Sequence, residues 1–137
     1  MLTAALATHL DTIGLGVHGR DGADVFLEDL PHTPENAVGV YAQPGRKVGR
    51  FRRPGVQIIV RADGTGGRAR AGYERAQDIL EALDGTSHLA WGDGSGDAVR
   101  VAWCEALQAQ PLSLGDDDNG RPRWSVRFDV ELAGEVS

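Results

Sequence analysis

The feature that most constrains the fold is a two-residue alternation of apolar and polar side chains near the end of the chain. Every second residue from Trp124 to Leu132 is apolar, and residues 99–103 alternate in the same way. Successive side chains of a strand point to opposite faces, so this period predicts two strands with one buried and one solvated face. We expect them to pair as an antiparallel hairpin across the long polar connection of residues 111–122.

Three further strands are predicted in the first half of the chain. Residues 24–30, 37–43 and 56–61 are rich in apolar and β-branched side chains and are bounded by glycines and prolines. Residues 88–91 are expected to form a short strand or an extended edge.

Two amphipathic helices complete the predicted elements. Apolar residues recur at helical spacing near the start of the chain and again after residue 72. The two stripes are Leu2, Ala5, Leu6, His9, Leu10 and Ile13, and then Tyr73, Ala76, Ile79, Leu80 and Leu83. Gly85 is placed to cap the second helix.

This order of elements predicts an α+β fold. A strand with one apolar and one polar face is typical of an antiparallel sheet that packs on one side only. We therefore expect a two-layer domain, a mostly antiparallel sheet of about five strands with two helices packed on one face. The 137 residues suit a single domain spanning residues 1–137.

The strongest local charge lies in residues 44–55, which we expect to form an exposed loop because glycines and prolines break any regular period. An aromatic within a basic loop could stack on a nucleic-acid base. However, 14 basic against 20 acidic residues give the chain a net charge of −6, which repels a polyanion. We favour a loop that contacts acidic groups of a neighbouring subunit. Its candidate contact residues are Arg46, Lys47, Arg50, Phe51, Arg52 and Arg53.

Two further groups are candidate contact residues. Asp116, Asp117 and Asp118 are expected at a solvated hairpin tip that could meet a basic loop of the next subunit or another protein. Trp91 is flanked by glycine and follows no clear strand period, so we expect it at an interface. Trp103 and Trp124 continue the apolar positions of their strands, and we expect both in the core.

The sequence offers no catalytic, metal or cofactor signature. The four histidines and the single cysteine, Cys104, are not at a metal-ligand spacing, and the aspartate run lacks the ligand pattern of an EF-hand. Gly64, Gly66 and Gly67 are not followed by the Lys-Ser or Lys-Thr of a phosphate-binding loop. We expect no enzyme activity and no cofactor. The amino terminus does not resemble a signal peptide, and no segment predicts a membrane span.

Several phrases, in a fixed order, carry a resemblance to a known family. They are GLGVHGRDGADVFLEDLPHTPENAVGVYAQPG at 14–45, RPGVQIIVRA at 53–62, ERAQDILEALDG at 74–85 and PLSLGDDDNGRPRWSVRFDVEL at 111–132. In this order they resemble the tail terminator family of long-tailed bacteriophages, whose members are often labelled minor capsid protein. The basic segment at residues 46–53 departs from the family pattern, so its role is not carried over.

The resemblance implies a structural virion protein at the tail–neck junction, assembled in the cytoplasm of the host bacterium. Such a subunit forms a homo-oligomeric ring, expected to be a hexamer, that caps the tail tube, ends elongation and provides the surface for joining to the head. Its implied partners are its own copies, the tail tube protein and head–tail connector or neck proteins, with passive DNA contact in the lumen as an alternative role for the basic loop. Prophage remnants and gene transfer agents use similar subunits.

Two other functions stay open at the level of sequence. One is a head-to-tail adaptor or tail-completion neck protein, which would differ in its position within the particle. The other is a small-molecule-binding α+β module, because such domains often carry ligands at subunit boundaries. No polar cluster in the sequence favours the second of these.

Overall fold

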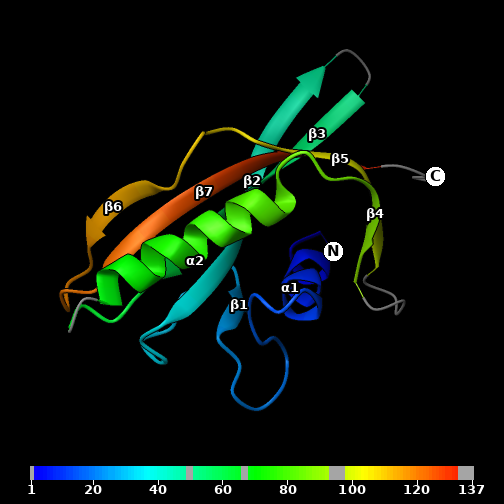
Figure 1. The fold of residues 1–137 in the computed structure, drawn as a ribbon. Helices are drawn as coiled ribbons and strands as arrows, with labels where there is room; N and C mark the ends of the chain where they lie inside the picture. Colours follow the sequence, from blue (N-terminus) through cyan, green and yellow to red (C-terminus); the bar gives the residue numbers. More distant parts are fainter. Residues whose placement is uncertain (1, 49–50, 66–67, 93–97, 133–137) are drawn as a thin grey trace.

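A computed structural model describes residues 2–48, 51–65, 68–92 and 98–132. Within these ranges the chain forms two helices and seven strands, shown in Figure 1. In chain order they are α1 (Leu2–Thr12), β1 (Val25–Leu27), β2 (Ala37–Val48), β3 (Phe51–Arg61), α2 (Arg68–Leu83), β4 (Ser87–Trp91), β5 (Val99–Ala106), β6 (Leu112–Asp116) and β7 (Pro122–Leu132).

The seven described strands make one mixed sheet in the order β1-β2-β3-β7-β5-β4, and β6 pairs with β7 as a side branch. Only β1 and β2 run parallel. β5 and β7 pair antiparallel, as their alternation predicts, with β6 formed inside the long connection between them. The α+β class is confirmed, but the expectation of about five strands is wrong, because β6 forms within the connection predicted to be a polar loop and β4 is predicted only as a short strand or an extended edge.

The sheet is curled, and the expected two-layer arrangement with both helices on one face is also wrong. α2 packs along β3, β7 and β5, whereas α1 contacts β1, β2 and β4, so it touches strands from both edges of the sheet. Figure 1 shows α1 lying between β1 and β4. Register shifts in the β2–β3, β5–β7 and β6–β7 pairs accompany this curvature, as bulges do.

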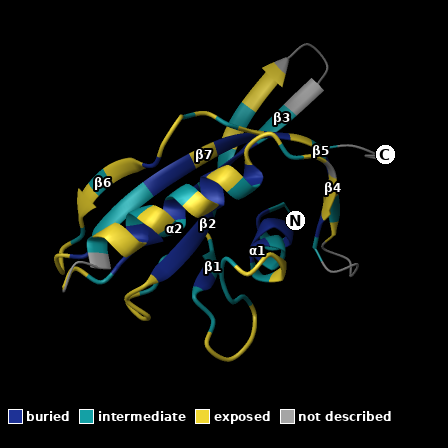
Figure 2. Ribbon diagram, viewed as in Figure 1, coloured by how far each residue is buried: buried dark blue, intermediate teal, exposed yellow. Residues whose placement is uncertain are grey.

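The core is formed by the inward positions of the central strands and by the buried sides of the helices (Figure 2). Ile58 lies opposite Val126 and Val56 opposite Phe128, and all four side chains are buried. This follows the alternation in the sequence. α2 comes close to the sheet at Gly72, where an added Cβ would lie 2.5 Å from the Cβ of Ala62. A side chain at that position would force the helix away.

The helices agree with the sequence stripes except that Ile13, expected on the first stripe, lies beyond the end of α1 and is exposed, and that the second helix starts earlier than expected. α1 buries Ala5, Leu6 and Leu10, as predicted, while α2 begins at Arg68, earlier than its apolar stripe. Gly85 follows α2 with a φ of 75°, in the left-handed region that favours glycine, which fits its predicted role as a cap. Neither helix, within the described part of the chain, has the length and apolar character needed to cross a bilayer.

Candidate assembly surfaces

Within residues 44–55, which we call the basic arm, the described residues 44–48 and 51–55 are not a loop but belong to the paired strands β2 and β3. β2 continues to Val48 and β3 starts at Phe51, so that Arg46 pairs with Arg53 and Lys47 with Arg52. The pairing continues past Pro44 and Gly45 because the register shift between Gln43 and Arg46 accommodates these two residues. The expected loop is wrong, because the partners of a residue across a strand pair do not show in the local sequence, whereas Arg46 and Lys47 are exposed as expected. In Figure 1 the arm projects beyond the rest of the sheet.

Two arginines of the basic arm form ion pairs with carboxylates of their own chain. Arg46 Nη2 lies 2.6 Å from Asp129 Oδ2, and Arg53 Nη2 lies 3.3 Å from Glu131 Oε1. Both acids are on β7, so the pairs fix the base of the arm against the sheet. The sequence predicts partners in an adjacent subunit, and for these two residues the chain itself provides them. Arg50 and the side chains of Phe51 and Arg52 lie outside the described part.

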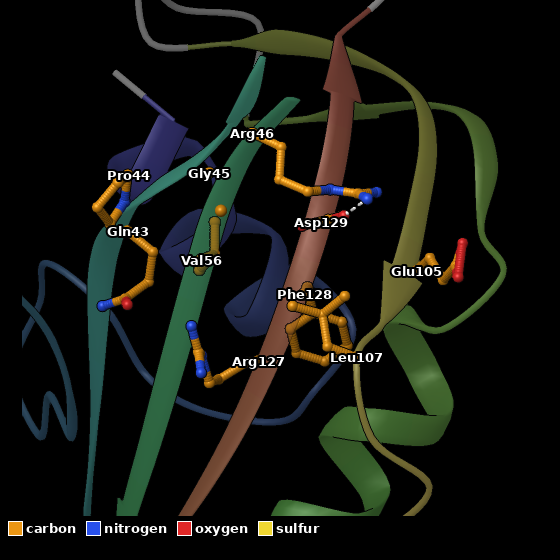
Figure 3. A pocket seen from close by; sticks show the side chains of 11 residues that line it. Gln43, Pro44, Gly45, Arg46, Val56, Glu105, Leu107, Arg127, Phe128 and Asp129 are labelled. Atoms are coloured by element: carbon orange, nitrogen blue, oxygen red, sulfur yellow. Dashed lines mark ion pairs between the residues drawn. The ribbon is translucent and has the colours of Figure 1, made fainter. Parts of the chain in front are cut away.

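A cleft of about 500 Å³ opens where the arm leaves the sheet (Figure 3). Asp129 is almost fully buried beside it, and Arg46 reaches over from the arm. The contact of Arg46 with Asp129 Oδ2 is close in distance but lacks the geometry of a hydrogen bond. Glu105 and Arg127 line the cleft from β5 and β7, and neither side chain forms an ion pair with a described residue. The cleft is therefore polar and open rather than an enclosed ligand site.

Exposed apolar side chains lie next to this cleft. Trp103 keeps 40% of its surface exposed and Leu107 keeps 51%, with Glu105 between them in the sequence. The expectation that Trp103 belongs to the core is wrong, because the register shift between Val101 and Trp103 changes which residues of β5 face inward. Its neighbour Cys104 is buried in its place.

Trp91 is fully buried, so its predicted place at an interface is also wrong. Its ring stacks on His9 of α1 with centroids 5.8 Å apart. β4 carries it onto the first helix because the sheet curls. The predicted core position of Trp124 agrees better, since this side chain is partly buried and packs edge-on against Tyr73 of α2.

The three predicted tip aspartates have different environments. Asp116 ends β6 and Asp118 lies in the following turn, and both are exposed. Asp117 instead accepts hydrogen bonds from the backbone amides of Asn119 and Arg121 and from Arg121 Nε, at 2.8–3.0 Å. The amide of Arg121 first, and then its side chain, lower the pKa of the Asp117 carboxyl. Asp117 therefore stabilises the turn of its own chain through these hydrogen bonds.

Two buried arginines, not found by sequence reasoning, hold this end of the molecule together. Arg61 donates to the carbonyl oxygens of Leu30, Pro31, His32, Pro34 and Glu35 at 2.5–3.4 Å. Arg121 Nη1 donates to the carbonyl of His32 at 2.6 Å while its Nε binds Asp117. Burial, and then the charge of Arg121, lower the pKa of Arg61. We call the joined segments 30–36 and 116–121 the loop platform.

The chain matches the bacteriophage tail terminator protein family over residues 9–133. The chain belongs to the bacteriophage tail terminator family. The resemblance seen in the sequence is therefore confirmed, and the coarse role follows, since this is a family of structural tail proteins and its members are virion components. No curated protein and no solved structure matches this terminator.

His9, His18 and Cys104 of the terminator are held in packing or backbone contacts. No group of three or more His, Cys, Asp or Glu side chains there could hold a metal ion. Burial raises the pKa of the Cys104 thiol to about 12, so it is not an activated nucleophile. His9 packs on Trp91, and His18 Nδ1 lies 3.2 Å from the carbonyl of Val25. The basic arm and the loop platform are the features left to explain.

Proposed function

We propose that this chain forms a homo-oligomeric ring, a hexamer, that caps the phage tail tube. The ring ends elongation of the tail at the tail–neck junction and offers its free face to the connector or neck proteins of the head. Its partners are then its own copies, the tail tube protein and the head–tail connector. Family membership supports the location, and the two unlike ends of the subunit support the ring.

The observation that carries the proposal is the presence of two different charged surfaces at opposite ends of the same strands. The basic arm extends β2 and β3 at one end, and the loop platform surrounds the start of β7 at the other (Figure 1). A ring requires a heterologous interface, in which one surface of each subunit meets a different surface of the next. A subunit with only one self-complementary surface would form a twofold dimer instead.

The test is the mass of the purified protein by light scattering over a concentration series, combined with electron microscopy and addition of purified tail tubes. We expect rings of uniform diameter, in solution or on tube ends, and tubes that no longer grow. A chain that stays monomeric and does not bind tube ends contradicts the proposal. Gold labelling at a neck position away from the tube end would favour the head-to-tail adaptor.

The alternative role of the basic arm, contact with DNA in the ring lumen, is separated by the same particles. Charge reversal in the arm that leaves assembly intact but causes loss of packaged DNA would assign the arm to the lumen. Loss of assembly would assign it to the subunit interface. The polar, open cleft beside the arm gives no support to the small-molecule-binding module.

A further inference from the structure

The basic arm contains two consecutive cross-strand pairs of like charge. Arg46 is directly opposite Arg53, and Lys47 is directly opposite Arg52. Like charges at directly opposed positions destabilise a hairpin. The first pair is neutralised by Asp129 and Glu131 of β7. Lys47, in the second pair, has no such carboxylate partner among the ion pairs of the described residues.

The second pair lies beyond the reach of the sheet. β7 pairs with β3 only from Gly55 onward, and Lys47 is exposed and forms no ion pair with any described residue. The subunit thus presents the ammonium of Lys47 to solvent, at the far end of a strand pairing that two opposed cationic residues weaken. An acidic partner at this point would offset the repulsion between Lys47 and Arg52. The pairing of these two residues therefore indicates that the partner carries carboxylates.

The loop platform offers carboxylates of this kind. Glu35, Asp116 and Asp118 are exposed, and none of them forms an ion pair with a described residue. Arg61 and Arg121 form no ion pair with these three carboxylates, because both side chains are turned inward onto backbone carbonyls and Asp117. These same bonds hold the platform in shape before a partner arrives, which lowers the entropy lost on binding.

The arm and the platform of one subunit cannot meet each other. They lie at opposite ends of β3, separated by the ten residue steps from Phe51 to Arg61. At roughly 3.3 Å per residue this is about 33 Å. The complementary charges can therefore combine only between copies, head to tail.

We propose that the outer half of the basic arm, at Lys47, binds the loop platform of a second copy of the chain at Asp116 and Asp118. The contact rests on the proposed ring and names the interface that closes it. Each subunit gives its arm to one neighbour and receives the arm of the other, while Arg46 and Arg53 keep their ion pairs within their own subunit.

The experiment uses two charge-reversed full-length proteins. One carries Lys47→Glu with Arg52→Glu, and the other carries Asp116→Lys with Asp118→Lys. Arg100→Glu and Asp78→Lys, at exposed positions on β5 and α2, are the matched controls. All variants are compared with the wild type by thermal unfolding, and their assembly is followed by light scattering and electron microscopy.

We expect each reversed protein to fold but to lose assembly alone, because its altered surface repels the unaltered one of the next copy. An equal mixture should regain rings, since the two proteins can then alternate with opposite charges at every contact. Rings formed by either reversed protein alone, or a mixture that stays unassembled while the wild type forms rings, would overturn this interface. If the wild type itself assembles neither in solution nor on tail tubes, the ring proposal fails first.

Discussion

His9 of α1 stacks on Trp91 of β4, with ring centroids 5.8 Å apart and planes inclined by 24°. The two residues join the first helix to the last strand in the sheet order, although 81 positions separate them in the chain. Because α1 also packs on β1 at the other edge, this contact closes the curl of the sheet.

Replacing Trp91 by alanine is predicted to destabilise the protein by about 3–5 kcal/mol, the usual cost of removing a fully buried large aromatic side chain. Trp103→Ala is the matched control, and because that side chain is 40% exposed we expect a loss of about 1 kcal/mol or less. Urea unfolding at one fixed protein concentration measures both. Equal losses for the two variants would contradict the assignment of Trp91 to the core.

The same contact predicts how stability depends on pH. Burial lowers the pKa of His9, so between the usual value of about 6.5 and the folded value the unfolded chain binds a proton that the folded protein does not. The free energy of unfolding should therefore fall as the pH falls through this window. His9→Phe keeps an aromatic ring against Trp91 without titrating. The difference between wild type and variant, followed by urea unfolding from neutral to mildly acidic pH, should vanish if the imidazole is not buried.

Much of the fold could be predicted because the central strands are long enough to show their period. The inward positions of β7, from Val126 to Val130, are those expected from the alternation. The sequence could not predict that Trp91 is buried and Trp103 is partly exposed, the reverse of the expectation. It depends on a register shift in β5 and on the curl that brings β4 onto α1, and both are set by contacts distant in sequence.

For the basic arm and the loop platform, the sequence predicts which charged residues are present but not the structure that they adopt. The charges of the arm are visible in the sequence, whereas its hairpin and its ion pairs to β7 need the register between β2, β3 and β7. Arg61 and Arg121 carry no local signal, because what distinguishes them is burial against carbonyls from other segments.

Cys104 should be unreactive in the folded protein. Burial raises the pKa of its thiol to about 12, so almost none of it is thiolate at mildly alkaline pH, and thiolate is the reactive form. We expect the rate of reaction with a disulfide reagent at about pH 8 to increase by orders of magnitude when the chain is unfolded in urea. A Cys104→Ala protein gives the background. Fast labelling of the native protein would show that β5 opens at this position.

The stability of the native state should also fall more steeply above about pH 9 in the wild type than in Cys104→Ala. The unfolded chain ionises its thiol near the ordinary value of about 8.5–9, while the folded protein keeps the proton until about pH 12. This group therefore stabilises the fold below that window and loses its contribution across it. Urea unfolding of both proteins at a series of alkaline pH values measures the difference, and parallel curves would contradict it.

Arg61→Lys is predicted to loosen the loop platform while keeping its charge. A guanidinium can donate to several carbonyls in one plane, as Arg61 does from Leu30 to Glu35, whereas a lysine ammonium cannot reach the same set. Buried carbonyls left without donors should cost at least about 2 kcal/mol. Hydrogen exchange should speed up in residues 30–36 and 116–121 and stay unchanged in α1. Arg100→Lys, at an exposed position, is the control.

Because the platform is also the proposed binding surface for the arm, Arg61→Lys should weaken assembly without altering any exposed carboxylate. Full assembly together with rapid exchange in these loops would mean that the platform need not be ordered in advance.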